Sequence, residues 1–173
     1  RPPGQLLAPV AAPAGLPAAQ RVFLMLQGPH GPFFDRVGQL LRDAGAQVWR
    51  VSFNAGDEFF WSDKARLIRH AAPPEEWPEH LDRIIAEKGV TDIVLYGDVR
   101  PVHAAARDAA QHYGLVMHVF EEGYLRPFWI TYERGGSNGH SALMRRPPPE
   151  TPHAPSTRPA QSNPPPAHWG DMR

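Results

Sequence analysis

The fold is decided by the stretch Val22-Phe23-Leu24-Met25-Leu26, which is followed by Gln27-Gly28-Pro29-His30-Gly31-Pro32. The five apolar residues predict a buried strand, and the glycines and prolines after them predict a turn. Apolar residues then recur at helical spacing from Phe33 to Leu41, and Gly45 marks the end of that helix. A second strand over residues 47–53 completes a βαβ unit, which we expect to be right-handed.

The rest of the chain continues this alternation of helices and strands. Pro73-Pro74 introduces a predicted helix that ends at Gly89, with Trp77, Leu81, Ile84 and Ile85 on its core face. A strand over Asp92–Tyr96, a helix over Val102–Tyr113 and a final strand over Leu115–Phe120 are predicted after it. Four strands alternating with three helices predict an α/β fold with an open, mostly parallel, Rossmann-like sheet. A later β-prone piece covers Trp129–Glu133.

The domain organisation follows from shifts in composition along the 173 residues. Residues 1–20 and 146–173 are rich in proline and poor in large apolar residues, so we expect a disordered leader and a proline-rich linker or disordered tail. Residues 21–145 are left as one domain, which is enough for one hydrophobic core. Because the chain opens with Arg1 rather than methionine, we expect it to be a fragment of a longer protein.

Composition excludes several classes of function. Lys plus Arg and Asp plus Glu both number 18, so no net charge draws the chain to nucleic acid. The nine histidines show no metal-ligand spacing, so no metal site is expected, and the absence of cysteine excludes disulfides and thiolate chemistry. No apolar run is long enough to span a bilayer, which leaves peripheral association as the expected mode of membrane contact.

Parallel sheets bind ligands at the carboxyl ends of their strands, so the segments after the four predicted strands should converge on one rim. These segments are Gln27–Gly31, Asn54–Asp57, Gly97–Arg100 and Glu121–Arg126. The first has glycines that let backbone N–H groups approach an anion, but it is neither a Walker loop nor a dinucleotide fingerprint. Within this segment, His30 is a candidate general base or a candidate hydrogen-bond donor to an anion. The alternative is that it only makes a hydrogen bond within the turn.

The segment Asn54–Trp61 is interpreted as a functional loop. Asp57 and Glu58, beside Asn54, have the donors and acceptors that sugar hydroxyls require, and the alternative is a solvated loop. The aromatic residues that follow, Phe59 to Trp61, would form a platform for a sugar or lipid, or would cover the core. For Asp98 and Arg100 the simplest interpretation is a local ion pair.

The acidic pair Glu121-Glu122 ends the fourth strand. Adjacent residues of an extended chain point to opposite sides, so one of the two should face the cleft. A carboxylate there would serve as a general base or a nucleophile in glycosyl transfer, and Arg126 would bind a carboxylate or phosphate. The alternative is a structural salt bridge between Arg126 and one glutamate.

Three motifs together carry a family resemblance: Leu26-Gln27-Gly28-Pro29 with Gly31-Pro32-Phe33-Phe34, Phe53-Asn54 with Gly56-Asp57, and Phe120-Glu121-Glu122-Gly123-Tyr124-Leu125-Arg126-Pro127 with Trp129-Ile130-Thr131. Over residues 21–145 the chain resembles the amino-terminal half of the bacterial capsule polysaccharide biosynthesis and export proteins of the KpsS/LipB type. The resemblance implies the acceptor-side domain of a two-domain GT-B glycosyltransferase.

The same resemblance implies a reaction and its partners. It implies transfer of Kdo from CMP-Kdo to a phosphatidylglycerol-type lipid, at the cytoplasmic, inner face of the membrane, together with capsule export and assembly proteins. No cofactor is implied, and CMP-Kdo would be bound chiefly by a second domain, so this chain would be inactive alone. Glu122 is the implied catalytic or acceptor-orienting residue, with Glu121 second.

The remaining residues implied by the resemblance are rim candidates: Gln27, Gly28, Pro29, Asn54, Gly56, Asp57, Gly123 and Arg126. Of these, six would bind substrate: Gln27, Gly28, Pro29, Asn54, Asp57 and Arg126. Arg126 would bind an acidic group of Kdo or the lipid phosphate. The competing hypothesis is a non-catalytic module that binds polysaccharide or docks onto an export complex. An oxidoreductase or methyltransferase domain is disfavoured because the first turn lacks the glycine spacing for a dinucleotide.

Overall fold

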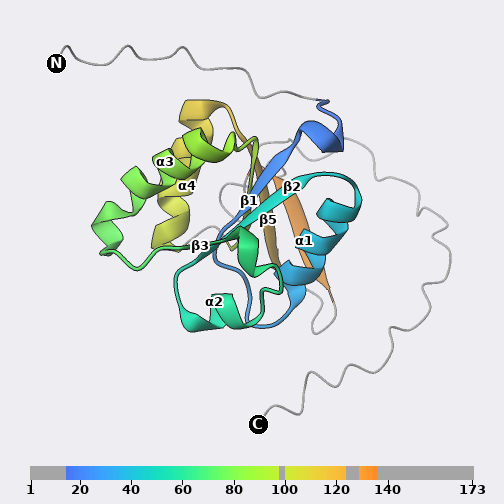
Figure 1. Ribbon diagram of the computed structural model, residues 1–173, viewed down its shortest axis with the longest axis horizontal. Coiled ribbons are helices and arrows are strands. Elements are labelled where there is room, and N and C mark those ends of the chain that lie inside the picture. Colours follow the sequence, from blue (N-terminus) through green and yellow to red (C-terminus); the bar gives the residue numbers. More distant parts are fainter. Residues whose placement is uncertain (1–14, 98–99, 124–128, 136–173) are drawn as a thin grey trace, which may run out of the picture.

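The computed structural model describes residues 15–97, 100–123 and 129–135 and shows an open, six-stranded sheet with helices on both faces (Figure 1). The strand order is β3-β2-β1-β4-β5-β6. The strands are β1 (Val22–Met25), β2 (Gln47–Ser52), β3 (Leu67–Arg69), β4 (Asp92–Tyr96), β5 (Val116–Glu122) and β6 (Ile130–Arg134). The first five pair in parallel and β6 pairs antiparallel to β5, so the fold is α/β and Rossmann-like.

Among the described residues, four α-helices lie in the connections between the first five strands: α1 (Phe33–Asp43), α2 (Ala55–Phe59), α3 (Trp77–Lys88) and α4 (Pro101–Tyr113). Short 3-10 turns cover Ala18–Gln20, Lys64–Arg66 and Pro74–Glu76. The predicted helix ends are confirmed, because Gly89 and Gly114 adopt the left-handed conformation after α3 and α4. No helix in the described part of the chain is both long and apolar enough to cross a bilayer.

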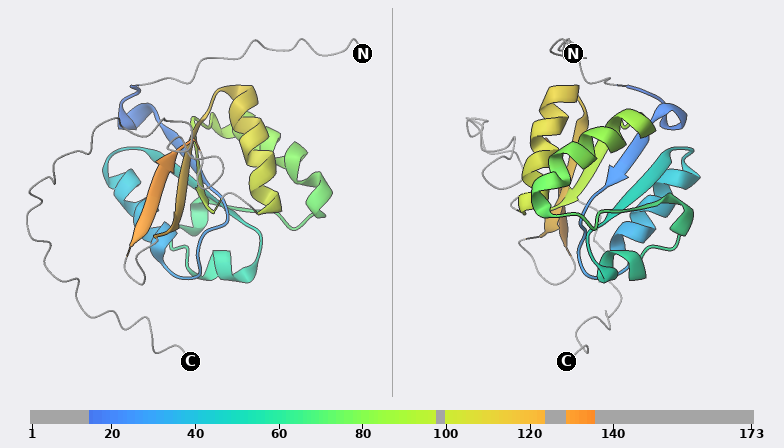
Figure 2. Two further views of the ribbon diagram at one scale, coloured as in Figure 1. Left: turned by 180° about the vertical axis from the view of Figure 1, so that it is seen from behind. Right: turned by 60° about the vertical axis from the view of Figure 1, so that its left-hand side comes forward.

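The alternation of side chains along β1 divides the core into two layers. Val22, Leu24 and Leu26 belong to the cluster that includes α3 and α4, whereas Phe23 and Met25 belong to the cluster on the α1 face. Figure 2 shows α3 and α4 on one side of the sheet and α1 on the other. The four residues expected on the core face of α3, namely Trp77, Leu81, Ile84 and Ile85, are all buried.

The structure differs from the sequence-based expectations in the number of strands. β3 was not predicted, since it has three residues, none of them fully buried, and offers no periodic pattern. The β-prone piece near residue 130 does form a strand, β6, at the edge of the sheet. The segment after β2 was interpreted as a loop, and this is wrong for residues 55–59, which form helix α2 with Asn54 as its N-cap.

The strand that was expected to end at Phe120 extends through Glu121 and Glu122. Antiparallel pairing with β6 explains the extension, because Glu121 lies opposite Thr131 and Glu122 opposite Ile130. The Gly123 N–H then donates to the Trp129 carbonyl at 2.7 Å, and a Cβ on Gly123 would lie 2.7 Å from that oxygen. Glycine at position 123 therefore lets the backbone at the end of β5 lie close to the backbone at Trp129.

The order of the strands places a topological switch point between β1 and β4. The chain runs from β1 outward to β2 and β3, and then returns through α3 to β4 on the other side of β1. Ligands of open α/β sheets bind at the carboxyl edge near such a point. The expectations for residues 1–14 and 136–173, and for Asp98 and Arg126, concern positions outside the described residues.

Candidate functional site

A cavity of about 210 Å³ lies at the carboxyl ends of β1 and β2. It is formed by the turn after β1, the start of α2, one side chain of β2 and one residue from the segment after β4. The residues around it are Gln27, Gly28, Pro29, His30, Gly31, Arg50, Asn54, Gly56, Asp57, Phe60 and Arg100. Five of the residues predicted to bind substrate, namely Gln27, Gly28, Pro29, Asn54 and Asp57, are thus brought together by the fold.

Gly28, which lines the cavity, packs closely against the side chains of Phe34 and Arg50. A Cβ at Gly28 would lie 2.7 Å from Phe34 Cδ2 and 3.2 Å from Arg50 Nη1. Phe34 is buried in the core on the α1 face, so its ring has little room to shift. Only glycine therefore lets the backbone after β1 lie directly against these two side chains.

Asn54 and Asp57 fix the start of α2. The Asn54 side chain accepts a hydrogen bond from the Asp57 N–H at 3.0 Å, which makes Asn54 a helix N-cap. Asp57 Oδ2 accepts from the Phe53 N–H at 3.1 Å, and Asp57 Oδ1 accepts from Arg50 Nη2 at 2.7 Å. Both carboxylate oxygens of Asp57 therefore already have protein donors, so Asp57 acts first as a structural residue of this site.

Arg50 is a site residue that the sequence analysis missed. It lies within β2 between the buried residues Val48 and Val51, and its side chain is 4% exposed. Burial lowers the pKa of Arg50, although the neighbouring Asp57 carboxylate raises it, and Arg100 contributes a further lowering. A charged residue flanked by the apolar residues Val48, Trp49 and Val51 is the signal that could have identified it.

His30 stands at the edge of the cavity and is exposed. Its ring lies 4.9 Å from that of Phe60 in an edge-to-face arrangement. The aromatic residues after β2 divide into separate roles: Trp61 is buried in the core, Phe60 borders the cavity and Phe59 is 80% exposed. Of the two alternatives for these residues, the core-covering role is therefore confirmed for Trp61, which cannot belong to a surface platform.

Glu58 faces a second, neighbouring cavity of about 450 Å³ rather than the first. Its carboxylate accepts two hydrogen bonds from Arg69 Nε and one from Arg69 Nη2, at 2.8–3.0 Å. The Arg69 hydrogen bonds are the main reason that the pKa of Glu58 is lowered. Asn54 lines both cavities, so the two adjoin at the amino end of α2.

Glu121 and Glu122 do not line the first cavity in the described part of the structure. Both lie in the paired end of β5, where Glu121 is half-buried and Glu122 is exposed. The fold thus groups the residues after β1 and β2 and leaves the acidic pair at β5, two strands away from β1 in the sheet. Among the described residues, no group of three or more His, Asp and Glu side chains is arranged to hold a metal ion.

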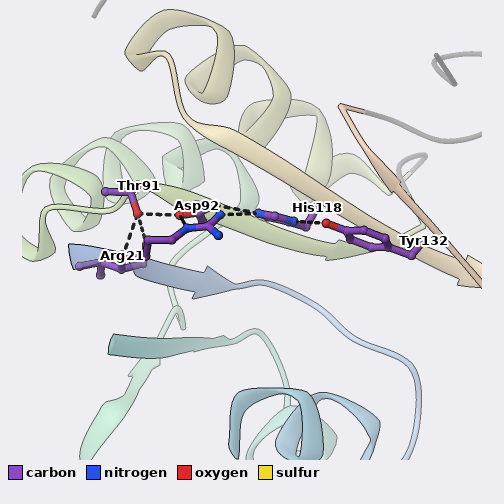
Figure 3. Close-up of polar contacts among 6 residues, drawn as sticks. Arg21, Thr91, Asp92, His118 and Tyr132 are labelled. Carbon is purple, nitrogen blue, oxygen red and sulfur yellow. Dashed lines mark hydrogen bonds and ion pairs between the residues drawn. The ribbon is translucent and has the colours of Figure 1, made fainter. Parts of the chain in front are cut away.

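A polar network at the other end of the sheet joins Arg21, Thr91, Asp92, His118 and Tyr132 (Figure 3). The Asp92 carboxylate, at the start of β4, accepts from His118 Nε2 at 2.7 Å and also pairs with Arg21. Burial alone would raise the pKa of Asp92, but hydrogen bonds from His118, Arg21 and Thr91 lower it to about 2.

Tyr132 connects this network to the edge of the sheet. Its hydroxyl lies 2.6 Å from His118 Nδ1, and with a neutral imidazole it donates the hydrogen bond. Burial raises the pKa of Tyr132, which is consistent with a protonated donor. The network therefore fastens β6 to β5 and β4, and its place near the amino ends of β1 and β4 separates it from the cavity.

Comparison with known proteins places the chain among capsule polysaccharide proteins. The family described as "Capsule polysaccharide biosynthesis protein" matches residues 91–158. The chain is 40% identical over 125 residues to "Capsule polysaccharide export protein KpsS" of Escherichia coli, an alignment that covers 72% of this chain and 32% of that protein. No solved structure matches the chain significantly.

A second relative supports the same assignment. The chain is 38% identical over 124 residues to "Capsule polysaccharide modification protein LipB" of Neisseria meningitidis serogroup A, which covers 71% of this chain and 30% of that protein. The chain thus spans about a third of the length of these curated relatives. The chain belongs to the capsule polysaccharide biosynthesis protein family.

Proposed function

We propose that this chain is the acceptor-side domain of a capsule glycosyltransferase that transfers Kdo from CMP-Kdo to a phosphatidylglycerol-type lipid. Membership of the capsule polysaccharide family supports the biological process. The observation that carries the molecular proposal is the polar cavity at the carboxyl ends of β1 and β2, beside the switch point of a Rossmann-like sheet. Amide, backbone and guanidinium groups there suit a polyol that carries an acidic group.

In this proposal the chain works as half of a GT-B enzyme. A second domain binds most of CMP-Kdo, no cofactor takes part, and the protein associates peripherally with the inner face of the cytoplasmic membrane alongside capsule export and assembly proteins. Gln27 and Asn54 orient the acceptor hydroxyls, and Asp57 holds the cavity wall. Glu122, with Glu121 second, supplies the carboxylate that acts on the acceptor hydroxyl or the anomeric carbon.

One observation favours a second function, a non-catalytic module that binds polysaccharide. Asp57 is the one carboxylate among the described residues that line the cavity, and both of its oxygens already accept hydrogen bonds. Binding a glycan there would need only the amide, imidazole and guanidinium groups. The two functions differ in whether Glu122 matters for turnover.

The test is transfer from CMP-Kdo to a lyso-phosphatidylglycerol analogue, with this chain compared with the protein extended through the next natural domain. Transfer by the extended form alone is the expected result. Glu122→Gln should abolish that transfer without unfolding the protein, and Glu133→Gln on β6 is a matched control that should keep it. Retained activity of Glu122→Gln would remove Glu122 from the mechanism, and binding of capsule glycan without transfer by either form would favour the binding module.

A further inference from the structure

Arg50 presents two unused guanidinium donors at the cavity. Its Nη2 binds Asp57, whereas Nε and Nη1 have no hydrogen-bond partner among the described residues, although the side chain is almost fully buried. Buried N–H groups without a partner are costly, and those of a cation are especially so. Nε and Nη1 of Arg50 are therefore available to donate hydrogen bonds to an acceptor that binds in the cavity.

The surroundings hold Arg50 in one position. Its guanidinium carbon lies 5.1 Å from the centre of the Phe34 ring, a cation–π contact, and its Nη2 is anchored by Asp57. A Cβ at Gly28 would lie 3.2 Å from Nη1, so glycine at that position keeps a side chain from pressing against the guanidinium group. An arginine that is fixed in this way loses little conformational freedom when it binds a ligand.

A second cation, Arg100, reaches the same cavity from the segment after β4. Arg50 and Arg100 face a single carboxylate there, Asp57, which leaves one positive charge in excess among the described arginine and carboxylate side chains that line the cavity. The two cations are close enough for Arg100 to disfavour the charged form of Arg50. An anion between them would relieve this repulsion.

We propose that Arg50 and Arg100 jointly bind one oxyanion, a carboxylate or a phosphate group, in the cavity at the ends of β1 and β2. Guanidinium groups bind both anions with charge-assisted, paired hydrogen bonds. This inference rests on the proposed function, since the lipid phosphate and the sugar carboxylate are the oxyanions of that reaction. It assigns to Arg50 and Arg100 the role that the sequence alone gave to Arg126.

The experiment is calorimetric titration of the full 173-residue chain with three separate probes: inorganic phosphate, free Kdo and dispersed lyso-phosphatidylglycerol. At least one probe should bind saturably. Arg100→Gln should weaken that binding roughly tenfold or more. Arg83→Gln, which removes an exposed arginine on α3, is the matched control and should leave the affinity unchanged.

Arg50 needs a variant that keeps the fold. Arg50→Gln combined with Asp57→Asn removes both charges of the buried pair and can keep a hydrogen bond between the two side chains, and thermal unfolding checks that it folds. This double variant should lose the same binding. If it does not fold, Arg100→Gln decides the question alone.

The three probes also identify the source of the anion. Saturable binding of Kdo points to a sugar carboxylate, whereas binding of phosphate or of the lysolipid points to a headgroup, and either result supports the site. Failure of all three probes to bind, or equal affinity of Arg100→Gln and the wild type, would overturn it. Anion binding through Arg100 without Kdo transfer by the extended protein would leave the site standing and refute the transferase proposal.

Discussion

Arg50 Nη2 and Asp57 Oδ1 lie 2.7 Å apart, and their side chains are only 4% and 7% exposed. The pair joins strand β2 to helix α2 and so holds one wall of the cavity. Charges at this depth are stable only when they are paired and hydrogen-bonded. The pair therefore sets the shape of the site as well as its charge.

Replacing Asp57 by alanine should destabilise the protein strongly, because the change leaves the Arg50 cation buried and unpaired. We expect the free energy of unfolding to fall by roughly 3 kcal/mol. Urea denaturation at neutral pH measures the change. Glu58→Ala, which breaks an ion pair with the exposed Arg69, is the matched control and should have a much smaller effect. Equal losses in the two variants would contradict the structural role of Asp57.

Gly28→Ala should disturb the cavity through packing. The new methyl group would meet Phe34 at 2.7 Å, inside normal contact distance. We expect a loss of about 1–3 kcal/mol in the free energy of unfolding, the usual cost of overpacking. Gly45→Ala would be a poor control, because Gly45 has a positive φ that disfavours alanine. Ala55→Gly, at the start of α2, is used instead to measure the effect on the backbone of exchanging alanine and glycine. An unchanged stability of Gly28→Ala would mean that the turn after β1 moves freely.

Asn54→Ala should remove the cap of α2. The Asn54 side chain accepts the Asp57 N–H, so its loss should cost about 1 kcal/mol. Asn54→Asp keeps an acceptor oxygen at the same place and should retain most of the stability. Chemical denaturation of the two variants beside the wild type measures this difference. Equal losses in the two variants would contradict the capping role of the Asn54 side-chain oxygen.

Asp92 should make the protein sensitive to acid. Its folded-state pKa of about 2 lies below the ordinary value of 3.8, so its stabilising effect is present above about pH 4 and is lost as the pH falls towards 2. The difference corresponds to about 2 kcal/mol. Asp92→Asn should therefore be less stable than the wild type at pH 6, whereas the two proteins should have similar stabilities near pH 2.

Unfolding followed at a series of pH values from 6 to about 2 measures this dependence. Asp108→Asn, which changes an exposed carboxylate on α4, controls for the loss of one charge. A wild-type stability curve that runs parallel to that of Asp92→Asn throughout this range would contradict the pairing in Figure 3.

The sequence predicted the elements with strong local signals. The apolar strands β1, β2, β4 and β5 and the helices α1, α3 and α4 lie where hydrophobic periodicity and glycine stops placed them. The convergence of residues 27–31 with Asn54 and Asp57 followed from strand direction alone. These features depend on short-range pattern, which a single sequence carries.

Other features depend on tertiary contacts and were missed. β3 is too short for a periodic pattern, and the end of β5 is set by its pairing with β6. Arg50 is charged yet buried because Asp57 and Phe34 surround it, and these contacts join residues from β2, α2 and α1. The Asp92–His118 bond likewise links residues 26 positions apart.

The most direct measurement of the central claim is Kdo transfer from CMP-Kdo to lyso-phosphatidylglycerol by the protein extended through its next natural domain, in wild-type and Arg100→Gln forms. We predict that the wild type transfers Kdo and that Arg100→Gln has a KM for the substrate carrying the bound anion raised roughly tenfold. Absence of transfer by a folded, extended protein that still binds capsule glycan would contradict the glycosyltransferase account.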